Sequence, residues 1–548
     1  MGNVFTNNDV NISFNNFLNT YLRFFYASFP MKKFTQTRHA KAWITPPIRK
    51  SCTIKTTLYM ISKNSSDPII KKNYKIYCKI LSEVITMEKK QYYNNLLIHS
   101  QNKQKTTWNI IKNLTNNHNI ILENSMNNGK LASESYNPIN YLHNVYTRPF
   151  TKIKLKHTTT GEIEEIIRNL KVKNSYGYDE ISTKIIKASA PYIRSPLSHI
   201  VNRILSTGIF PHRLKFSEIK PVYKKGDRTN FANYKPISLL PSFSKIFEKL
   251  THKRLDKHIR NNNILAKEQY GFVVNSSTEI ATHNLLNTML SSLNNKLYVG
   301  VLFCDLQKAF DGVNHELLIS KMNFYGITGI ANKLIKSYLS NRYQRLVTND
   351  NKLNKISSKW EEAKCGVAQC SILGPLIFLL YINDFPKTIS EISSRILFAD
   401  DTSIIIANPN PTEFTKNTNQ LLSYISRWFI SNMLYLNYDK TYFMQFVTKK
   451  NKEIDMRVNF ANKCISNISN TKFLGLTIDA SMSWKVHIKE LTTKINKACY
   501  AIILIKPIVS LNVLITIYFA VFTLLYHTIS YFGATQVTVQ IFSLSKKE

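Results

Sequence analysis

Two adjacent aspartates, Asp400 and Asp401, stand between apolar runs at residues 395–399 and 402–406. Short apolar runs on both sides of a polar pair are typical of a β-hairpin, and the pair would then form its tip. Aspartate also favours tight turns, because its side chain hydrogen-bonds to nearby backbone amides. Taken alone, the pair therefore indicates a turn as readily as a chemical site.

A third carboxylate changes this interpretation. Asp305 directly follows another apolar run, residues 298–304. If that run is a strand beside the hairpin, three carboxylates meet, and like charges repel unless protons or cations neutralise them. Hard divalent cations such as Mg²⁺ take oxygen ligands, and two of them about 3.5 to 4 Å apart can activate an attacking hydroxyl and stabilise a leaving phosphate oxygen. The three aspartates therefore predict phosphoryl or nucleotidyl transfer.

The charge of the chain indicates the substrate class. In 548 residues, 73 lysines and arginines stand against 34 acidic residues, which gives a net charge of +39. Lys and Arg are spread along the chain, as expected for an extended nucleic-acid channel, although a merely basic solvated surface is the plainer alternative. The sequence has no Gly-x-x-x-x-Gly-Lys-Ser/Thr loop and no His-Glu-x-x-His, which disfavours a P-loop ATPase and a zinc protease.

Cysteine use and hydropathy bear on the compartment. None of the seven cysteines forms a Cys-x-x-Cys pair or a zinc-spaced set, which favours a reducing, intracellular location, nuclear or cytoplasmic. The most apolar stretch, residues 513–526, is shorter than the roughly 18 to 20 residues that span a bilayer. We therefore predict a buried helix there and no membrane partner.

The elements that must position these residues follow from apolar periodicity. We expect no clear structure in residues 1–30 and a linker at residues 116–159. Helical spacing is present at residues 68–97, 162–170, 182–205, 244–261, 277–293, 315–324 and 412–433. Strand-like runs occupy residues 298–303, 395–399, 402–406, 443–447 and 472–478. Few strands alternate regularly with helices, so we predict an α+β fold in which helices cover an antiparallel sheet.

Several motifs occur together in one order. Residues 398–401 resemble motif C of reverse transcriptases, and residues 305–311 resemble motif A of the non-LTR (LINE-type, jockey-like) retrotransposon branch. Further boxes with the family's wording are residues 214–227, 233–240, 269–272, 277–278, 366–376 (motif B), 437–441 (motif D) and 473–475 (motif E). Any single box is modest evidence, whereas the ordered set is specific.

The resemblance implies a right-hand polymerase. Fingers and palm would occupy residues 160–479, a partial helical thumb residues 480–548, and a mainly helical, connector-like segment residues 1–115. It implies an RNA-directed DNA polymerase that joins a dNTP to the 3′-OH of a DNA primer on an RNA template. Asp305, Asp400 and Asp401, with the Leu306 carbonyl, would hold two Mg²⁺ ions, for which Mn²⁺ is an alternative.

The resemblance also implies a set of contacts to the incoming dNTP. They are Lys224, Lys225 and Lys235 beside the triphosphate, Phe310 as a gate against a 2′-OH, Gln369 at the sugar, and Lys440 as a proton donor to pyrophosphate. Without the motifs, these residues would be interpreted as a solvated turn, a core aromatic and a loop amide.

Four positions depart from the family pattern. Ala368 and Cys370 replace the usual Pro and Gly of motif B, Lys235 replaces Arg, and Val273 stands where an Arg normally follows. A Cys at a glycine position would demand an unfavourable backbone angle or crowd the nucleotide.

These departures keep an alternative open, an inactive RNA-binding remnant of such an element. A group II intron maturase is a third possibility, which the motif wording fits less well. Family members usually begin with an endonuclease, and we expect this chain to begin inside the connector that follows one. The oligomeric state is not indicated.

Overall fold

The computed structural model describes residues 2–30, 43–100, 102–114, 150–349, 355–389, 393–448, 453–456, 458–460 and 463–520. The chain forms two compact units. The first comprises residues 1–30 and 121–483, and the second comprises residues 31–120 and 484–548. The predicted boundaries at residues 115, 159 and 479 stay predictions, although residues 1–30 belong to the first unit and not with the helices that follow them.

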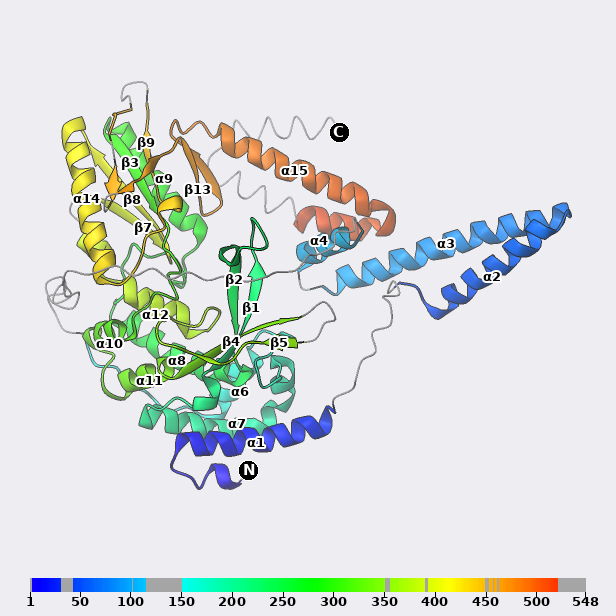
Figure 1. Cartoon of the computed structure of the whole chain (residues 1–548), viewed down its shortest axis with the longest axis horizontal. Helices are drawn as coiled ribbons and strands as arrows, with labels where there is room; N and C mark the ends of the chain where they lie inside the picture. The colour runs from blue at the N-terminus through cyan, green and yellow to red at the C-terminus, as the bar shows by residue number, and fades with distance from the viewer. Residues whose placement is uncertain are drawn as a thin grey trace. The chain divides into compact units, whose positions relative to one another are not determined.

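One of two five-stranded sheets, which we call the first sheet, lies at one end of the first unit (Figure 1). Its order is β12 (Ser466–Asn467), β9 (Tyr442–Phe446), β3 (Tyr298–Cys304), β8 (Asp401–Asn408) and β7 (Ser394–Phe398). All neighbours are antiparallel except β12 and β9. Strand β3 is buried at every position after Tyr298, as expected for a central strand covered on both faces. The predicted α+β class is confirmed, whereas this sheet is mixed and not wholly antiparallel, because β12 runs parallel to β9.

Two amphipathic helices pack on this sheet, α9 (Thr278–Asn294) against β3 and β7, and α14 (Pro411–Ser431) against β8. Gly300 of β3 lets the aromatic layer approach. A Cβ built there would lie 2.5 Å from the Phe443 ring and 2.9 Å from the Phe414 ring. The glycine therefore serves close packing inside a strand.

A second sheet lies in the same unit. Its main order is β2 (Tyr234–Leu239), β1 (Phe216–Tyr223), β4 (Arg342–Asn349) and β5 (Lys355–Ser357), and β6 (Glu361–Ala363) also pairs with β4. The helices of this region are α6 (Thr160–Arg168), α7 (Thr183–Thr207), α8 (Ser242–Asn261), α10 (His315–Phe324), α11 (Gly329–Leu339), α12 (Leu373–Ile382) and α13 (Phe385–Thr388). Short two-stranded sheets pair β10 (Asn459–Phe460) with β11 (Lys463–Cys464), and β13 with β14.

The expectation of no structure before residue 30 is wrong. Helix α1 (Val10–Ser28) is capped by the Asp9 side chain, which accepts a hydrogen bond from the Ile12 amide at 2.9 Å. Phe14 and Phe17 are fully buried and pack edge-on against the rings of α8. Asparagines between the apolar positions hide a helical spacing that becomes evident once α8 supplies a surface to cover.

The predicted strand at residues 472–478 is a hairpin. Strands β13 (Asn470–Phe473) and β14 (Leu476–Asp479) pair antiparallel around Leu474 and Gly475, which both have positive φ angles of 44° and 100°. Two consecutive residues with positive φ match the twist of a tight β-hairpin turn. The other predicted helices and strands are present to within a few residues.

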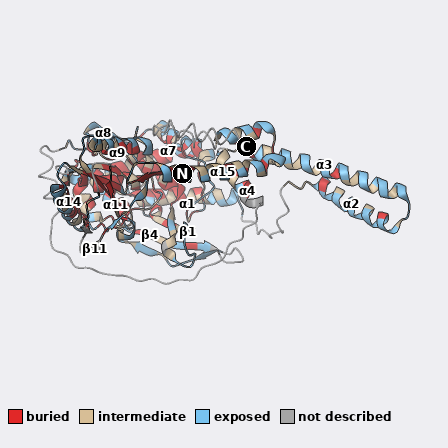
Figure 2. Ribbon diagram, turned by 90° about the horizontal axis from the view of Figure 1, so that it is seen from above, coloured by how far each residue is buried: buried red, intermediate tan, exposed pale blue. Residues whose placement is uncertain are grey.

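The second unit is helical in its described part. It contains α2 (Pro46–Asn64), α3 (Pro68–Ile98), α4 (Lys103–Leu114), α15 (Lys485–Ile505) and further helical residues at 511–520. Helices α2 and α3 form a largely exposed hairpin (Figure 2) in which the Tyr77 hydroxyl donates to the Ser51 carbonyl at 3.2 Å. The helix predicted at residues 68–97 is thus confirmed.

The helix predicted at residues 513–526 is only half buried. Val513 and Ile517 are buried, whereas Leu511 and Phe519 are more than half exposed. Residues 521–526 lie outside the described residues. In the described part of the chain, no helix combines the length and apolarity that a membrane span requires.

One ion pair lies entirely inside the first unit. The Lys321 ammonium of α10 donates to Asp384 Oδ1 at 2.6 Å and to the Tyr381 carbonyl at 2.7 Å. Asp384 Oδ2 accepts the Trp428 indole N–H at 3.0 Å. Both charged side chains are at most 1% exposed, and burial lowers the pKa of Lys321. The ion pair and its hydrogen bonds connect α10 with Tyr381 of α12 and with Trp428 of α14.

We expect Lys321→Met to lower the free energy of unfolding by about 3–5 kcal/mol, because Asp384 would stay buried without its cation. Denaturation in urea measures this change. The double variant Lys321→Met/Asp384→Leu removes both charges and should recover most of the loss. A single variant that loses less than about 1 kcal/mol would show that the pair is not energetically coupled to the core.

Candidate active site

The acidic pair lies at the tip of a hairpin, as its sequence predicts. Phe398 of β7 pairs with Asp401 of β8, so Ala399 and Asp400 alone make the turn. Ala399 has a φ of +58°, a left-handed angle that a non-glycine residue adopts only where its surroundings enforce it. The hairpin is therefore held in a strained turn.

The register between β3 and β8 brings Asp305 to the same place. Cys304, the last residue of β3, pairs with Thr402, so the same register carried one residue further places Asp305 opposite Asp401. Side chains directly opposite each other on antiparallel strands lie on the same face of the sheet. The structure thus brings Asp305, Asp400 and Asp401 together.

The pKa values of the pair reflect this crowding. Although Asp401 reaches solvent, desolvation by the surrounding protein, with the charges of Asp400 and Asp305, raises its pKa to about 6. Burial and the Asp305 charge also raise the pKa of Asp400, while the charges of Lys235 and Lys224 oppose that shift. The three carboxylates are therefore electrostatically coupled.

Gln269 fixes the turn from outside the hairpin. Its buried Oε1 accepts the Ala399 amide at 3.0 Å and the Gly271 amide at 2.8 Å. Residues 268–270 extend the sheet beside β7, since the Tyr270 amide donates to the Leu397 carbonyl at 2.8 Å. A Cβ on Gly271 would lie 2.2 Å from the Ala399 nitrogen, so only glycine fits there. Residues 269–272 are a motif box, but their wording alone does not reveal this supporting role.

Asp305 has partners from a second loop. Its Oδ2 accepts from the Asn437 amide group at 3.0 Å and from the Lys440 ammonium at 3.2 Å. The structure therefore pairs Lys440 directly with a proposed metal ligand. Leu306 forms an isolated bridge with Leu436, made by hydrogen bonds of the flanking residues, which leave the Leu306 carbonyl out.

The motif B loop packs on the segment after Asp305. The Gln369 side-chain N–H group lies 3.2 and 3.3 Å from the two carboxylate oxygens of Asp311, whose pKa burial raises. The Val367 amide donates to the Phe310 carbonyl at 2.8 Å. The Phe310 ring stacks on Phe378 with 4.7 Å between centroids and 23° between planes. Phe310 and Gln369 thus lie on two neighbouring segments that are hydrogen-bonded to each other.

The three lysines lie on the β1–β2 hairpin and are exposed. The Lys224 amide donates to the Asn233 carbonyl at 2.8 Å where the hairpin connection begins. Lys224 and Lys235 influence the carboxyl of Asp400, as described above. Among the described residues, no hydrogen bond or ion pair joins Lys225 to the three aspartates.

The carboxylate oxygens of the three aspartates are the kind of ligand that a hard divalent cation prefers. The charge of Asp305 helps to raise the pKa values of Asp400 and Asp401, and such crowding of carboxylates favours a neutralising cation with oxygen ligands. Yet the structure describes no cluster of three or more His, Cys, Asp or Glu residues placed to hold a metal. One carboxylate oxygen of Asp305 accepts a hydrogen bond from the Lys440 ammonium.

Comparison with known proteins assigns the segment that carries this site. Residues 222–478 match the family model described as reverse transcriptase (RNA-dependent DNA polymerase). This segment is similar to reverse transcriptases. It contains both strands of the acidic hairpin, Asp305 and the motif B loop.

Three curated relatives come from mobile elements of Drosophila melanogaster. A probable RNA-directed DNA polymerase from transposon BS is 28% identical over 362 residues, 64% of this chain and 38% of the relative. The RNA-directed DNA polymerase from mobile element jockey is 26% identical over 343 residues, 61% of this chain and 37% of the relative. A probable RNA-directed DNA polymerase from transposon X-element is 25% identical over 344 residues, 61% and 36%.

These relatives confirm the resemblance to the jockey-like, non-LTR branch. The matched part of the chain spans less than two fifths of the length of each.

The motif B loop contains a residue with an unfavourable backbone angle. Cys370 is exposed and has a φ of +75°, the left-handed region that favours glycine. The unfavourable backbone angle expected for a Cys at this position is therefore present.

We expect Cys370→Gly to raise the free energy of unfolding by up to about 1 kcal/mol, because glycine adopts this φ without a Cβ clash. Thermal unfolding of the full chain measures the change. Cys370→Ala is the control, since it removes the thiol and keeps the strain. Equal stability of the Gly and Ala variants would contradict strain at this residue.

Proposed function

We propose that the chain is an RNA-directed DNA polymerase that transfers nucleotides from dNTPs to the 3′-OH of a DNA primer on an RNA template. The observation that carries this proposal is the convergence of Asp305, Asp400 and Asp401 at one sheet edge, which the register of β3 and β8 imposes. The reverse transcriptase match of residues 222–478 supports it.

In this proposal the first unit holds the fingers and palm. The first sheet, which contains β3 and β8, is the palm together with α9 and α14. The second sheet with α6, α7 and α8 belongs to the fingers. Helix α15 begins the partial thumb, and α2 to α4 form the connector-like segment. The arrangement of two sheets and their helices in the first unit is consistent with this division.

We assign the cation site to the three aspartates and the Leu306 carbonyl. Two Mg²⁺ ions, or Mn²⁺ ions, would lower the pKa of the primer 3′-OH and neutralise the charge that develops on pyrophosphate. Lys440, whose ammonium lies 3.2 Å from Asp305 Oδ2, would donate a proton to the leaving pyrophosphate. Asn437 orients Asp305 through its 3.0 Å hydrogen bond.

The remaining residues act on the incoming nucleotide. Lys224 and Lys235 face the acidic site from the β1–β2 hairpin and attract the triphosphate, and Lys225 adds charge at the same connection. Phe310 excludes a 2′-OH because its ring is clamped against Phe378 and cannot move aside. Asp311 orients the Gln369 amide toward the sugar.

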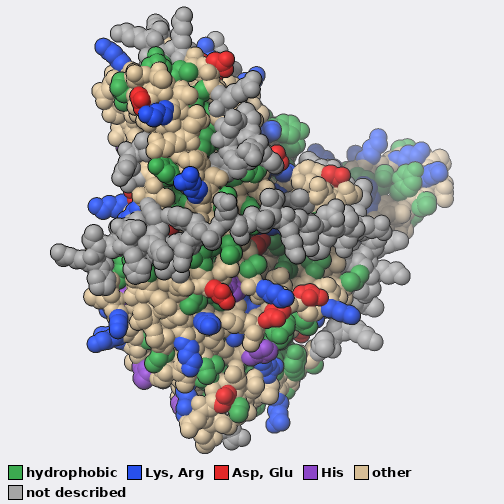
Figure 3. All heavy atoms as spheres, turned by 60° about the vertical axis from the view of Figure 1, so that its left-hand side comes forward, with side chains coloured by type: hydrophobic (Ala, Val, Ile, Leu, Met, Phe, Trp, Pro, Cys, Tyr) green, Lys and Arg blue, Asp and Glu red, His purple; other side chains and the backbone are tan. Residues whose placement is uncertain are grey.

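The charge of the surface supports nucleic-acid partners. Lys and Arg side chains are scattered over the face seen in Figure 3 without gathering in one patch. In the second unit the described residues include 18 lysines and arginines against 4 acidic residues. Contacts of such side chains with phosphates release counterions and supply sequence-independent affinity.

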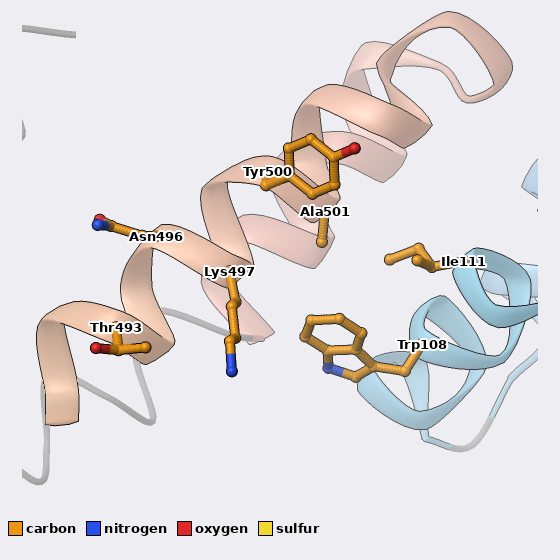
Figure 4. A pocket seen from close by; sticks show the side chains of 7 residues that line it. All are labelled: Trp108, Ile111, Thr493, Asn496, Lys497, Tyr500 and Ala501. Carbon is orange, nitrogen blue, oxygen red and sulfur yellow. The ribbon is translucent and has the colours of Figure 1, made fainter. Parts of the chain in front are cut away.

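A pocket in the second unit offers a place for an unpaired base. Trp108 and Ile111 of α4 face Lys497, Tyr500 and Ala501 of α15 across it (Figure 4). The Trp108 ring and the Lys497 side chain approach each other from the two helices, and Tyr500 is 63% exposed. Aromatic faces beside a lysine are typical of single-strand binding, where bases stack and a cation contacts the backbone.

We expect purified protein to extend oligo(dT) on poly(rA) with dTTP and Mg²⁺. Asp400→Ala and Asp401→Ala should each lower the rate at least about 100-fold, because each removes a carboxylate worth several kcal/mol of transition-state stabilisation. Asp455→Ala, an exposed aspartate outside the site, is the control and should extend normally. Absent extension by the wild-type chain with retained RNA binding would instead favour an inactive remnant.

We expect Trp108→Ala and Tyr500→Ala each to weaken binding of oligo(U) by about 1–3 kcal/mol, the usual range for one stacked base. Fluorescence anisotropy at a fixed salt concentration measures the affinity. Tyr192→Ala, which removes an 83% exposed tyrosine of the first unit, is the matched control. If all three variants bind alike, the pocket does not contact single strands.

A further inference from the structure

A fully buried carboxylate lies on α8, outside the acidic site. Glu248 has no exposed surface. Its Oε1 accepts the Ser244 hydroxyl at 2.7 Å, and its Oε2 accepts the Ile372 amide at 2.7 Å. Burial of a carboxylate is costly unless its oxygens are hydrogen-bonded, so this contact is built into the fold.

The Ile372 amide belongs to the start of α12. Ile372 is the N-cap of that helix, and its own side chain makes no capping hydrogen bond. Ser371 Oγ accepts the Gly374 amide at 3.0 Å, which satisfies one further group. Helix α12 is apolar throughout and carries no acidic residue in its first turn. Glu248 therefore supplies, from another element, the acceptor for the Ile372 amide, while Ser371 serves Gly374.

The Ile372 amide lies at the C-terminal end of the motif B loop, residues 366–372. The other end of the loop is hydrogen-bonded to the segment that follows Asp305. The Gly366 amide donates to the Val313 carbonyl at 2.8 Å, and the Gln369 side chain donates to Asp311. Between these anchors lies Cys370 at a φ of +75°. Strained residues persist only where their surroundings over-determine them, and Glu248 is one of the two anchors.

We propose that Glu248 is a positioning residue that fixes the motif B loop, and with it Gln369, for dNTP binding without touching the nucleotide. This inference rests on the proposed polymerase function for its consequence, but not for its structural content. Loss of the carboxylate leaves the Ile372 amide without this acceptor, and the loop loses the anchor on its C-terminal side.

Hydrogen exchange on the full chain tests the anchor without requiring activity. Glu248→Ala should raise amide exchange in residues 366–375 about tenfold, the scale expected for a lost buried hydrogen bond. Glu248→Gln should stay near wild type, since its carbonyl can accept the Ile372 amide while its amide donates to Ser244. If the alanine variant fails to fold, Glu248→Asp, which is too short to reach both partners, should give the same local increase.

Asn383→Ala is the matched control, because it also removes a buried side chain that accepts a backbone amide from another element, that of Ala266 at 2.8 Å. It should not change exchange in residues 366–375. Equal exchange in this segment for the Ala, Gln and control variants would overturn the proposal.

Primer extension at varied dTTP then tests the consequence. Glu248→Ala should raise the KM for dTTP about tenfold with a smaller change in kcat, whereas Glu248→Gln should stay within about threefold of wild type. Raised exchange with an unchanged KM would overturn the positioning role. If the wild-type chain extends nothing, the polymerase proposal fails, and the exchange data alone decide whether Glu248 anchors the loop.

Discussion

The structure depends on holding three like charges at one edge of a sheet. Carboxylates this close repel one another, so the backbone must keep them in place against their own electrostatics. Strand β3 meets this demand because it is hydrogen-bonded on both sides, to β8 and to β9. A slip of one residue would turn every side chain of β3 to the other face, and burial of the strand opposes that slip.

The groups that support the site are polar side chains brought in from distant parts of the chain. Gln269 holds the hairpin turn, Asn437 holds Asp305, and Glu248 holds the loop opposite. Each spans more than 100 residues of sequence to its partner, so each bond ties two elements together as well as positioning the site. Buried polar groups with satisfied partners specify one arrangement where apolar packing alone tolerates several.

The parts that the sequence predicts best are those with local causes. Helix α10 has the bounds that its periodicity predicts, and the acidic hairpin lies where two apolar runs flank a polar pair. Helix α1 escapes prediction because its apolar face has meaning only against α8. Helix α12 also escapes prediction from apolar periodicity, because a helix that is buried all round has no polar face.

The same distinction applies to the candidate site. Asp305, Asp400 and Asp401 stand out because each ends or begins an apolar strand. Gln269 and Glu248 do not, because their roles are set by backbone amides of residues far away in sequence. Lys440 illustrates the limit from the other side, since its motif is recognisable but its ion pair with Asp305 is visible only in three dimensions.

The order in which the two units use the chain has a consequence for synthesis. Residues 31–120 of the second unit leave the ribosome long before residues 484–548 that complete it. At about 5–20 residues per second, the helices α2 to α4 wait roughly 20–70 s for α15. During that interval the apolar side of α4, with Trp108, has no α15 to cover it. Transiently exposed apolar surface of this kind favours aggregation of a nascent chain.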